Sequence, residues 1–462
     1  MRLTLADVIR ATGGHAEGVP PVGELVITGV STDTRTLRPG DLFVPLRGPR
    51  HDGHDFVGEA FRKGSVVSLV ARRVDHVRGP LVRVDNTLHA LAGLARYYRS
   101  TLGVRVVGVT GSVGKTTTTA MCAAVLGTVY TVARTKDEWN AEIGVPLAIL
   151  AVTPHTDVVV IEMAMRGLGQ IAELVEIASP AIGVVTNIGD THRELLGTIE
   201  NITRAKGELV EGLPEDGTAV LNADDDRVMG LAPRSHAPIL TYGVDRPADI
   251  TADAVTFSAQ GMRFRLRRDD GEVDVHLPTW GVHNVRNALA AAGVARVMDV
   301  GLDAVRRGLE RFEPPTMRLQ PVHTGDVLII NDAYNASPVS MSAAFDVLRR
   351  VAWGRRRVLV LGEMRELGAG AGPAHRSVGA EAATAADVLV TVGGHHALEI
   401  GDGAAGASMP EERIHHVSSP TRAVELLDTL LHPGDIVLVK GSRGIRTERI
   451  AIALGALTGA DV

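Results

Sequence analysis

The sequence predicts an α/β protein built from three domains. Its 462 residues are about three times the usual domain length of ~150 residues. Short apolar runs rich in Val and Ile alternate with stretches typical of helices, which indicates parallel sheets covered on both faces. The pair Pro314-Pro315 precedes a second series of such runs and marks a boundary or hinge. We therefore divide the chain into residues 1–98, 99–313 and 314–462.

The first domain is the smallest of the three and is predicted to contain short strands and turns. It begins with MRLTLADVIRATGG, which is typical of an amphipathic helix and not of a cleavable apolar signal. It ends in the helix-like stretch TLHALAGLARYYRS. Between these, HDGHD at residues 51–55 looks like a metal cluster, but no acidic or histidine partner has the spacing diagnostic of zinc. We expect a loop that binds a polar ligand or has a structural role.

The central domain is predicted to contain a parallel sheet. The runs VRVVGVTG, DVVVIEMAM and AIGVVTNIG are short and apolar, and helical stretches such as KTTTTAMCAAVLGTV separate them. The second and third runs contain Glu162 and Asn187 at their polar ends. Because ligands of open α/β sheets bind at the carboxyl ends of strands, we expect chemistry at these positions.

The third domain is predicted to be a doubly wound, Rossmann-like sheet. Four strand candidates recur with helical stretches between them, namely VLIIND, RVLVLGEM, DVLVTVGG and DIVLVKGS. None of the turns has the spacing G-x-G-x-x-G, so a dinucleotide site is only weakly indicated. We expect the Gly- and Ala-rich residues 401–408 to form a loop, and the pairs His395-His396 and His415-His416 to lie in surface loops.

Composition argues against several classes of function. The formal net charge is −6 and aromatic residues make up 3% of the chain, which disfavours a nucleic-acid surface. No apolar stretch approaches the ~20 residues that a membrane-spanning helix needs. The single cysteine, Cys122, excludes an internal disulfide and is expected to be a buried helix thiol. We expect a cytoplasmic monomer with no nucleic-acid partner and no membrane span.

The stretch GVTGSVGKTTTT has the order strand, glycine turn, GKT and helix that a phosphate-binding loop requires. The usual P-loop pattern has Gly or Ala at the position of Val109, so the match is incomplete. Backbone N–H groups between Gly111 and Gly114 would face an anion, with the helix dipole in support. Lys115 would neutralise β- and γ-phosphates, and the Thr116 hydroxyl would reach Mg2+. A glycine turn that merely starts a helix is the weaker alternative.

Four further polar residues have roles that the residues alone leave open. Glu162 could hold Mg2+ and Arg166 could bind an anion, or the two could form a surface ion pair. His192 could ligate a metal beside the phosphate site, or be solvated as loop histidines usually are. Lys206 lies in a stretch with one apolar helical face and is, by itself, predicted to be an ordinary helix lysine.

Eleven segments, taken in order, resemble the Mur ligase family. They are TGSVGKTT, WNAEIGVP, EMAMRGLGQI, TNIGDTH, AKGEL, LNADD, GVHNVRNALAA, MRLQ, NDAYNASPVSM, LGEMRELG and LVKGSRG. The N-terminal TDTRTLRPGDLFVPLRG, followed by DGHDF, extends the resemblance over nearly the whole chain. AYNASP and GEMRELG look most like the family members that add D-alanyl-D-alanine. The Asp-Asn-Pro-Arg sequence of the members that add a diamino acid does not occur in this sequence.

The resemblance implies an ATP-dependent ligase that joins D-alanyl-D-alanine to a UDP-N-acetylmuramoyl tripeptide through an acyl phosphate, in peptidoglycan precursor synthesis. It implies a first domain that holds the UDP end of the substrate, a central P-loop domain that binds ATP, and a third domain that completes the ligase. The catalytic residues would be Lys115, Glu162, His192 and Lys206.

The resemblance also implies which residues contact each ligand. For ATP they are Gly111, Ser112, Val113, Gly114, Lys115, Thr116, Thr117, Asn284, Asn287, Arg318 and Asp332, with the two asparagines on the adenine. For Mg2+ they are Thr116, Glu162, His192 and Lys206, where carbamylation would turn the lysine into a metal-binding carboxylate. For the substrate they are Thr34, Arg35, Asp52, Gly53, His54, Asn140, Arg166 and Asn335.

The family's own loop has the pattern T-G-x-x-G-K-T/S and does not require glycine at Val109. The sequence departs from the usual family pattern at Val113, Ala141, Ala164 and Ser337. Two other functions stay open: a related Mur or folylpolyglutamate synthase-like ligase with another acceptor, and a catalytically idle paralogue that binds nucleotide. The UDP-type first domain argues against a folylpolyglutamate synthase-like enzyme, and the intact catalytic candidates argue against an idle paralogue.

Overall fold

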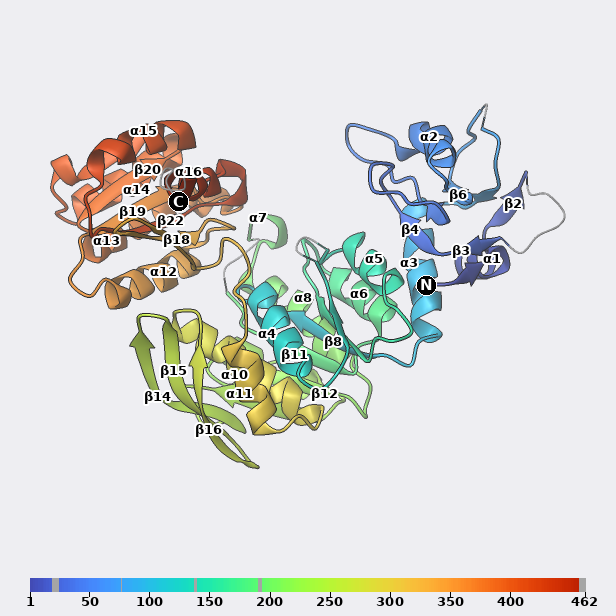
Figure 1. The fold of residues 1–462 in the computed structure, drawn as a ribbon, viewed down its shortest axis with the longest axis horizontal. Helices are drawn as coiled ribbons and strands as arrows, with labels where there is room; N and C mark the ends of the chain where they lie inside the picture. Colours follow the sequence, from blue (N-terminus) through green and yellow to red (C-terminus); the bar gives the residue numbers. More distant parts are fainter. Residues whose placement is uncertain (19–24, 76, 137–138, 190–192, 457–462) are drawn as a thin grey trace.

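The computed structural model describes residues 1–18, 25–75, 77–136, 139–189 and 193–456. The chain forms three lobes: an N-terminal lobe in blue, a central lobe in cyan to yellow and a C-terminal lobe in orange and red (Figure 1). The central lobe lies between the other two. Within the described ranges, no helix has both the length and the apolar character needed to cross a bilayer.

The N-terminal lobe contains two small sheets. One has five strands in the order β2-β7-β6-β5-β4, and the other pairs β1 with β3. The strands are β1 (Leu3–Thr4), β2 (His15–Glu17), β3 (Val26–Ile27), β4 (Gly29–Ser31), β5 (Asp41–Phe43), β6 (Val67–Val70) and β7 (Leu81–Arg83). The helices are α1 (Leu5–Thr12), η1 (Gly53–Phe56), α2 (Val57–Arg62) and α3 (Thr87–Ser100).

Helices α1 and α3 confirm the two helices predicted for this lobe. Thr4 and Asp7 form a capping box at the start of α1, which satisfies N–H groups that a helix leaves unpaired. Helix α3 packs against the central lobe, where the Tyr98 hydroxyl donates to the carbonyl of Val152 at 2.8 Å. The Arg99 side chain donates to the carbonyl of Ala178 at 2.9 Å. The join between the two lobes is therefore held by polar contacts as well as by the chain.

The central lobe has a nine-stranded sheet in the order β16-β15-β14-β13-β12-β11-β8-β10-β9. The strands are β8 (Arg105–Thr110), β9 (Val132–Arg134), β10 (Val158–Glu162), β11 (Ile182–Val185), β12 (Thr218–Asn222), β13 (Ile239–Gly243), β14 (Ile250–Ser258), β15 (Gly261–Arg268) and β16 (Gly271–Leu277). Strands β8 to β14 are all parallel to one another, as the sequence predicts. Strand β15 pairs antiparallel with both β14 and β16. The antiparallel extension was not predicted.

Two layers of helices cover the parallel part of this sheet. The helices are α4 (Lys115–Leu126), α5 (Gly144–Leu150), α6 (Gln170–Ala178), α7 (Arg193–Leu196), α8 (Ile199–Glu211), α9 (Asp226–Met229), η2 (Ala232–Arg234), α10 (Val282–Val297) and α11 (Leu302–Glu310). Successive residues of β10 enter different cores. Val160 packs with residues of α4, α10 and α11, and Ile161 packs with residues of α5, α6 and α8. Cys122 of α4 is fully buried, as predicted, and burial raises the pKa of its thiol to about 12.

The C-terminal lobe has a six-stranded sheet in the order β17-β18-β22-β19-β20-β21, which confirms the doubly wound prediction. The strands are β17 (Gln320–Thr324), β18 (Val327–Asp332), β19 (Arg357–Gly362), β20 (Val388–Val392), β21 (Ile414–Val417) and β22 (Ile436–Lys440). The helices are α12 (Pro338–Val351), η3 (Gly368–Gly370), α13 (Ala371–Ala385), α14 (His395–Gly406), η4 (Glu411–Arg413), α15 (Pro420–Leu430), η5 (Arg443–Ile445) and α16 (Glu448–Ala456). Helices α12, α13 and α14 pack in one core, and α15 and α16 pack in the other.

The prediction of a Gly- and Ala-rich loop at residues 401–408 is wrong over most of its length. These residues continue α14 to Gly406, and His395 and His396 begin that helix. The glycines allow close helix packing, because a Cβ on Gly403 of α14 would collide with the carbonyl of Arg376 on α13. His415 and His416 lie on β21 and not in a loop.

Besides the approach of Glu194 on α7 to Gly368 on η3, two further connections join the central lobe to the C-terminal lobe within the described ranges. The first is the chain itself, where Met317 and Leu319 have φ of 61° and 49°, values that non-glycine residues rarely adopt. The second is the end of β14, where Phe257 packs against the C-terminal core and the Arg350 guanidinium of α12 lies 5.1 Å from its ring centroid. Trp280 adds to this contact by donating from Nε1 to the carbonyl of Ser258 at 3.0 Å.

Candidate active site

The predicted phosphate loop lies between β8 and α4 at the carboxyl edge of the central sheet. Gly111 and Gly114 have φ of 148° and 88°, which only glycine adopts readily. A Cβ on Gly114 would lie 2.7 Å from Oδ1 of Asn287, so a side chain at this position would have to displace the buried Asn287 amide. Val109 is fully buried in β8 between β10 and β11. The residue that breaks the usual P-loop pattern therefore belongs to the strand.

The segment after β11 supports this loop. Asn187 accepts from the backbone N–H of Val113 at 2.9 Å and donates from Nδ2 to the carbonyl of Val113 at 2.8 Å. Ser112 donates from Oγ to the carbonyl of Gly189 at 2.9 Å. The loop is therefore held in shape before any ligand enters.

Two lysines converge on the carbonyl of Gly111. Nζ of Lys115 donates to it at 3.0 Å, and Nζ of Lys206, on α8, donates to it at 2.8 Å. Lys206 is only 2% exposed, so the prediction of an ordinary helix lysine is wrong. Burial, together with the charge of Lys115, lowers the pKa of Lys206 well below its ordinary value. Burial also lowers the pKa of Lys115, while nearby Glu162 opposes this shift.

Glu162 and Thr116 form an oxygen-rich pair beside the loop. The Thr116 hydroxyl donates to Oε2 of Glu162 at 2.7 Å, and Nδ2 of Asn140 donates to Oε1 at 3.0 Å. Glu162 is 6% exposed, and this excludes the surface ion pair considered above. A hydroxyl and a carboxylate are ligands that Mg2+ prefers, so the donor set fits that ion. His192, the other predicted ligand, lies outside the described residues.

Arg318 reaches this pair from the connection to the C-terminal lobe. Its Nη2 donates to the Thr116 hydroxyl at 2.8 Å, and its guanidinium lies 4.1 Å from the ring centroid of Tyr334. Asp332, also predicted, accepts from Nζ of Lys440 at 2.6 Å and from the backbone N–H of Leu319 at 3.1 Å. The carboxylate of Asp332 is therefore engaged by protein groups.

The two asparagines predicted for adenine lie in the first two turns of α10. Nδ2 of Asn284 donates to the carbonyl of Trp280 at 2.7 Å, and Nδ2 of Asn287 donates to Oδ1 of Asn284 at 3.1 Å. His283 lies beside them, and burial lowers its pKa to about 4, so its imidazole is neutral at pH 7.

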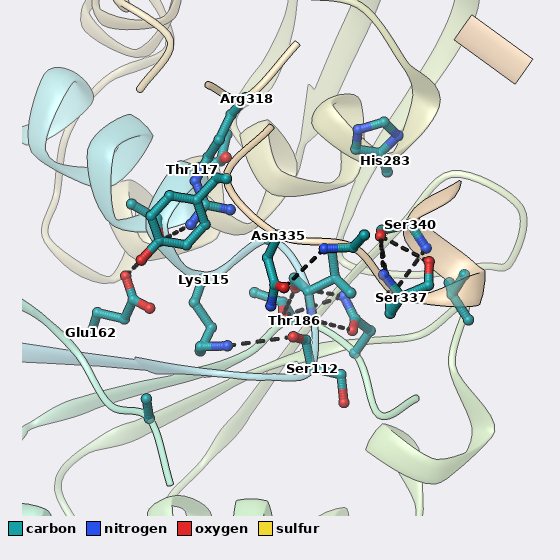
Figure 2. A pocket seen from close by; sticks show the side chains of 18 of the residues that line it. Ser112, Lys115, Thr117, Glu162, Thr186, His283, Arg318, Asn335, Ser337 and Ser340 are labelled. Atoms are coloured by element: carbon teal, nitrogen blue, oxygen red, sulfur yellow. Dashed lines mark hydrogen bonds between the residues drawn. The ribbon is translucent and has the colours of Figure 1, made fainter. Parts of the chain in front are cut away.

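These groups surround one cavity of about 1400 Å³ between the central and C-terminal lobes (Figure 2). Its lining includes fourteen of the predicted residues, namely Ser112, Val113, Gly114, Lys115, Thr116, Thr117, Asn140, Glu162, Arg166, Asn284, Asn287, Arg318, Asp332 and Asn335. Gly111 and Lys206 do not line the cavity: Gly111 is the first residue of the loop, and Lys206 contacts its carbonyl. Ser337 also lines the cavity and is the N-cap of α12, where it forms a capping box with Ser340.

The substrate residues predicted in the N-terminal lobe do not line this cavity; among the described residues, its wall comes from the other two lobes. Asp52 accepts from the backbone N–H of His54 at 3.0 Å, and His54 is buried with Nε2 accepting from the backbone N–H of Ala71 at 2.9 Å. These contacts shape the loop that contains Gly53. Thr34 is also buried, whereas Arg35 is exposed and paired with Asp33.

The cavity-wall residues that sequence reasoning missed include His283, Tyr334 and Lys440. Lys440 left a detectable signal, because a lysine that closes the apolar run IVLVK must be paired if the strand is buried. His283 and Tyr334 left no comparable signal. Each lies in a family segment in which other residues were predicted to bind ligands, and nothing in the sequence sets these two apart.

A phosphate loop that faces a second doubly wound lobe across a shared cavity defines a multidomain P-loop protein. The chain belongs to the Mur ligase family. Residues 26–99 match the Mur ligase family, catalytic domain; residues 109–295 match the Mur ligase middle domain; and residues 317–443 match the Mur ligase, glutamate ligase domain.

The relatives are similar over almost their whole length. The UDP-N-acetylmuramoyl-tripeptide--D-alanyl-D-alanine ligase of Bacillus subtilis (strain 168) is 36% identical over 449 residues, which cover 96% of each chain. A crystal structure of MurF from Acinetobacter baumannii superposes with a TM-score of 0.89 at 28% identity and covers 99% of both chains. A MurF ligase from Thermotoga maritima in complex with ADP gives a TM-score of 0.84 at 29% identity, covering 94% of this chain and 99% of the other.

Proposed function

We propose that this chain is an ATP-dependent ligase that forms an amide bond between D-alanyl-D-alanine and a UDP-N-acetylmuramoyl tripeptide, in peptidoglycan precursor synthesis. The observation that carries the proposal is the cavity, where the phosphate loop, the Glu162–Thr116 pair and Arg318 of the adjoining lobe meet. The names of the relatives support this choice of donor and acceptor.

The reaction needs activation because a carboxylate is a poor electrophile at neutral pH. The tripeptide carboxylate forms a bond to the γ-phosphorus of ATP as the bond to ADP breaks. The amine of the acceptor then attacks the carbonyl carbon, loses a proton, and expels inorganic phosphate. Two anions must meet in the first step, so the positive charges of Lys115 and Arg318 act by neutralisation and positioning. No side-chain nucleophile is required.

We place ATP phosphates at residues 111–117 and adenine near Asn284 and Asn287, as the family resemblance implies. Thr116, Glu162 and His192 would hold Mg2+, which neutralises charge on the phosphates when bound. The UDP end would bind near Thr34, Arg35 and residues 52–54. The peptide would extend toward Asn140, Arg166 and Asn335, which would bring its terminal carboxylate into the cavity. We propose that the enzyme acts as a monomer in the cytoplasm and that its domains are residues 1–98, 99–313 and 314–462.

Carbamylation of Lys206 is the second part of the proposal. A neutral lysine amine reacts with carbon dioxide, forming an N–C bond and releasing one proton, and the product is a carboxylate. The pKa of Lys206 is lowered by burial, so its amine is neutral far more often than that of an exposed lysine. The modified side chain would add a carboxylate next to the phosphate loop, where Lys206 now meets the carbonyl of Gly111.

The proposal is tested by phosphate release with a matrix of UDP-muramoyl peptides and amine acceptors, with products weighed by mass spectrometry. We expect an amide product with D-alanyl-D-alanine and none with glutamate or a diamino acid. Turnover with glutamate alone would favour a folylpolyglutamate synthase-like ligase. ATP binding without turnover on any pair would favour an idle paralogue.

The Lys115→Ala variant tests the role of the phosphate loop. Substrate-dependent phosphate release should be abolished while the circular dichroism spectrum stays unchanged. Lys136→Ala is the matched control, because Lys136 is exposed and lies over the Trp139 ring outside the cavity wall. Retained turnover in Lys115→Ala would contradict the assignment.

A further inference from the structure

One wall of the cavity is formed by the segment that follows β19, residues 363–367. Arg365, Glu366 and Leu367 line the cavity from this segment. The segment leaves the carboxyl end of a strand next to β22, at the point where the strand order of the C-terminal sheet reverses. Open α/β sheets bind ligands at such points. The ATP and UDP residues implied by the family resemblance include none of these three, so this wall is available to the remaining substrate, the amine acceptor.

The backbone of this segment is fixed at two successive residues. The N–H of Met364 donates to Nε2 of His375 at 2.8 Å, and the N–H of Arg365 donates to Oγ of Ser442 at 2.9 Å. Glu363 contributes its carbonyl, which accepts from the N–H of Ser442 at 3.1 Å. The direction in which Arg365 and the residue after it leave the strand is therefore set by His375 and Ser442.

His375 is suited to this task because both of its ring nitrogens are committed. The side chain lies on α13 and is fully buried. Nδ1 lies 2.7 Å from the carbonyl of Ala371 and must donate to it, so Nε2 carries the lone pair that accepts from Met364. Burial lowers the pKa of His375, which keeps the ring in this neutral form.

The surroundings of His375 exclude a metal site as the alternative role. His396 stacks on the His375 ring with centroids 4.9 Å apart, and Nδ1 of His396 lies 2.6 Å from Oε2 of Glu399. The three side chains are close enough together to suggest a metal cluster. However, His375 has no lone pair left for an ion, because one nitrogen carries hydrogen and the other accepts from the Met364 backbone.

We infer that His375 is a positioning residue for the amine acceptor, and that it acts by holding residues 363–367 so that Arg365 and Glu366 face the cavity. The inference rests on the proposed function for the identity of the acceptor. D-Alanyl-D-alanine is a zwitterion with an ammonium group at one end and a carboxylate at the other. Adjacent side chains of opposite charge match both ends. His375 contacts no substrate itself.

Three variants of His375 separate positioning from stability. His375→Phe keeps a ring that can stack but removes both hydrogen-bonding atoms. His375→Gln can present an acceptor oxygen near the Nε2 position, whereas His375→Asn is too short and reaches only the Nδ1 position. We expect His375→Phe and His375→Asn to raise KM for D-alanyl-D-alanine about tenfold. His375→Gln should have a KM for D-alanyl-D-alanine close to that of the wild type. KM for ATP should change less than about twofold in all three.

His416→Phe is the matched control, because His416 lies in the same lobe on β21 and is exposed. It should leave every kinetic constant unchanged. A purely structural role of His375 would lower the amount of active enzyme and hence kcat, without a selective change in KM for the acceptor. An unchanged acceptor KM in His375→Phe, or an equal rise in KM for ATP, would overturn the inference.

Hydrogen–deuterium exchange provides a readout that does not depend on the proposed reaction. The amide of Met364 should exchange faster in His375→Phe than in the wild type, and His375→Gln should restore its protection. If the wild-type enzyme uses another acceptor, the matrix assay reports that failure separately, and the same variants are then measured with the acceptor found. Unchanged exchange at Met364 would refute the role of His375 whatever the acceptor is.

Discussion

Arg318→Ala should lower kcat/KM for ATP by about 30- to 700-fold. The side chain makes two contacts that alanine cannot replace, a charged hydrogen bond to Thr116 at 2.8 Å and a stacking contact with Tyr334 at 4.1 Å. The first is worth about 1.5–3 kcal/mol and the second about 0.5–1 kcal/mol. Their sum of about 2–4 kcal/mol corresponds to this range at about 1.4 kcal/mol per tenfold. Arg318→Lys should recover only part of the loss, because an ammonium group cannot stack and donate as guanidinium does.

The assay is phosphate release at varied ATP with the other substrates saturating. Arg350→Ala is the control, since Arg350 also bridges the two lobes by stacking on Phe257 but does not line the cavity. It should stay within about fivefold of the wild type, as expected for an exposed contact of about 0.5–1 kcal/mol at about 1.4 kcal/mol per tenfold. If Arg318→Ala also stays within that limit, or if both variants lose activity equally, the reasoning from the Thr116 contact is refuted.

Three further predictions follow from single positions. Gly114→Ala should abolish phosphate release, because the new Cβ would lie 2.7 Å from Oδ1 of Asn287. Gly169→Ala is the control: Gly169 has a similar φ but no atom within 4 Å of the new Cβ, so the variant should lose only about 1 kcal/mol of stability. Lys206→Ala should be inactive, and wild-type enzyme in ¹³C-bicarbonate should show a carbamate signal that the variant lacks. The pKa of His283 is about 4 against an ordinary value of 6.5, so only the unfolded chain takes up this proton between these values. Stability should therefore fall as pH falls through this window, by up to about 1.4 kcal/mol per unit.

The corresponding measurements are phosphate release with urea unfolding for the glycine variants, carbon NMR for the lysine, and urea unfolding at several pH values for wild type and His283→Asn. Equal activity of the two glycine variants would contradict the steric argument. An active Lys206→Ala enzyme would remove that lysine from catalysis. If His283→Asn has the same pH dependence of unfolding as the wild type, the histidine does not contribute to it.

Much of the fold was predictable because buried parallel strands are continuous apolar runs. DVVVIEMAM and DIVLVKGS were identified in this way, and they form β10 and β22. The antiparallel strands were missed because half of their residues face solvent, as in GMRFRLRR, where alternate residues are exposed and buried. At residues 401–408 the prediction failed because a helix was taken for a loop. Glycine usually favours a loop, but here it permits α13 and α14 to pack closely.

The site was predictable where its residues are neighbours in sequence. The turn from Gly111 to Thr116 is one motif, and it forms as expected. The burial of Lys206 was not predictable, because it depends on a contact with Gly111 across 95 positions of sequence. The apolar run that ends at Lys440 indicates that this lysine needs a partner, but its pairing with Asp332, 108 positions away, was not predictable for the same reason. Contacts of this kind arise from the order of strands in the sheets, which local patterns do not determine.

The described parts of the C-terminal lobe and the central lobe meet at the chain around Met317, at Phe257 against α12, and at Gly368 of η3 beside Glu194 of α7. Arg318, which stacks on Tyr334, and Arg365 both line the shared cavity. If the C-terminal lobe moves as a rigid unit, it carries both arginines toward or away from the phosphate loop together. ATP and the acceptor would then be enclosed in one movement and not in two separate ones.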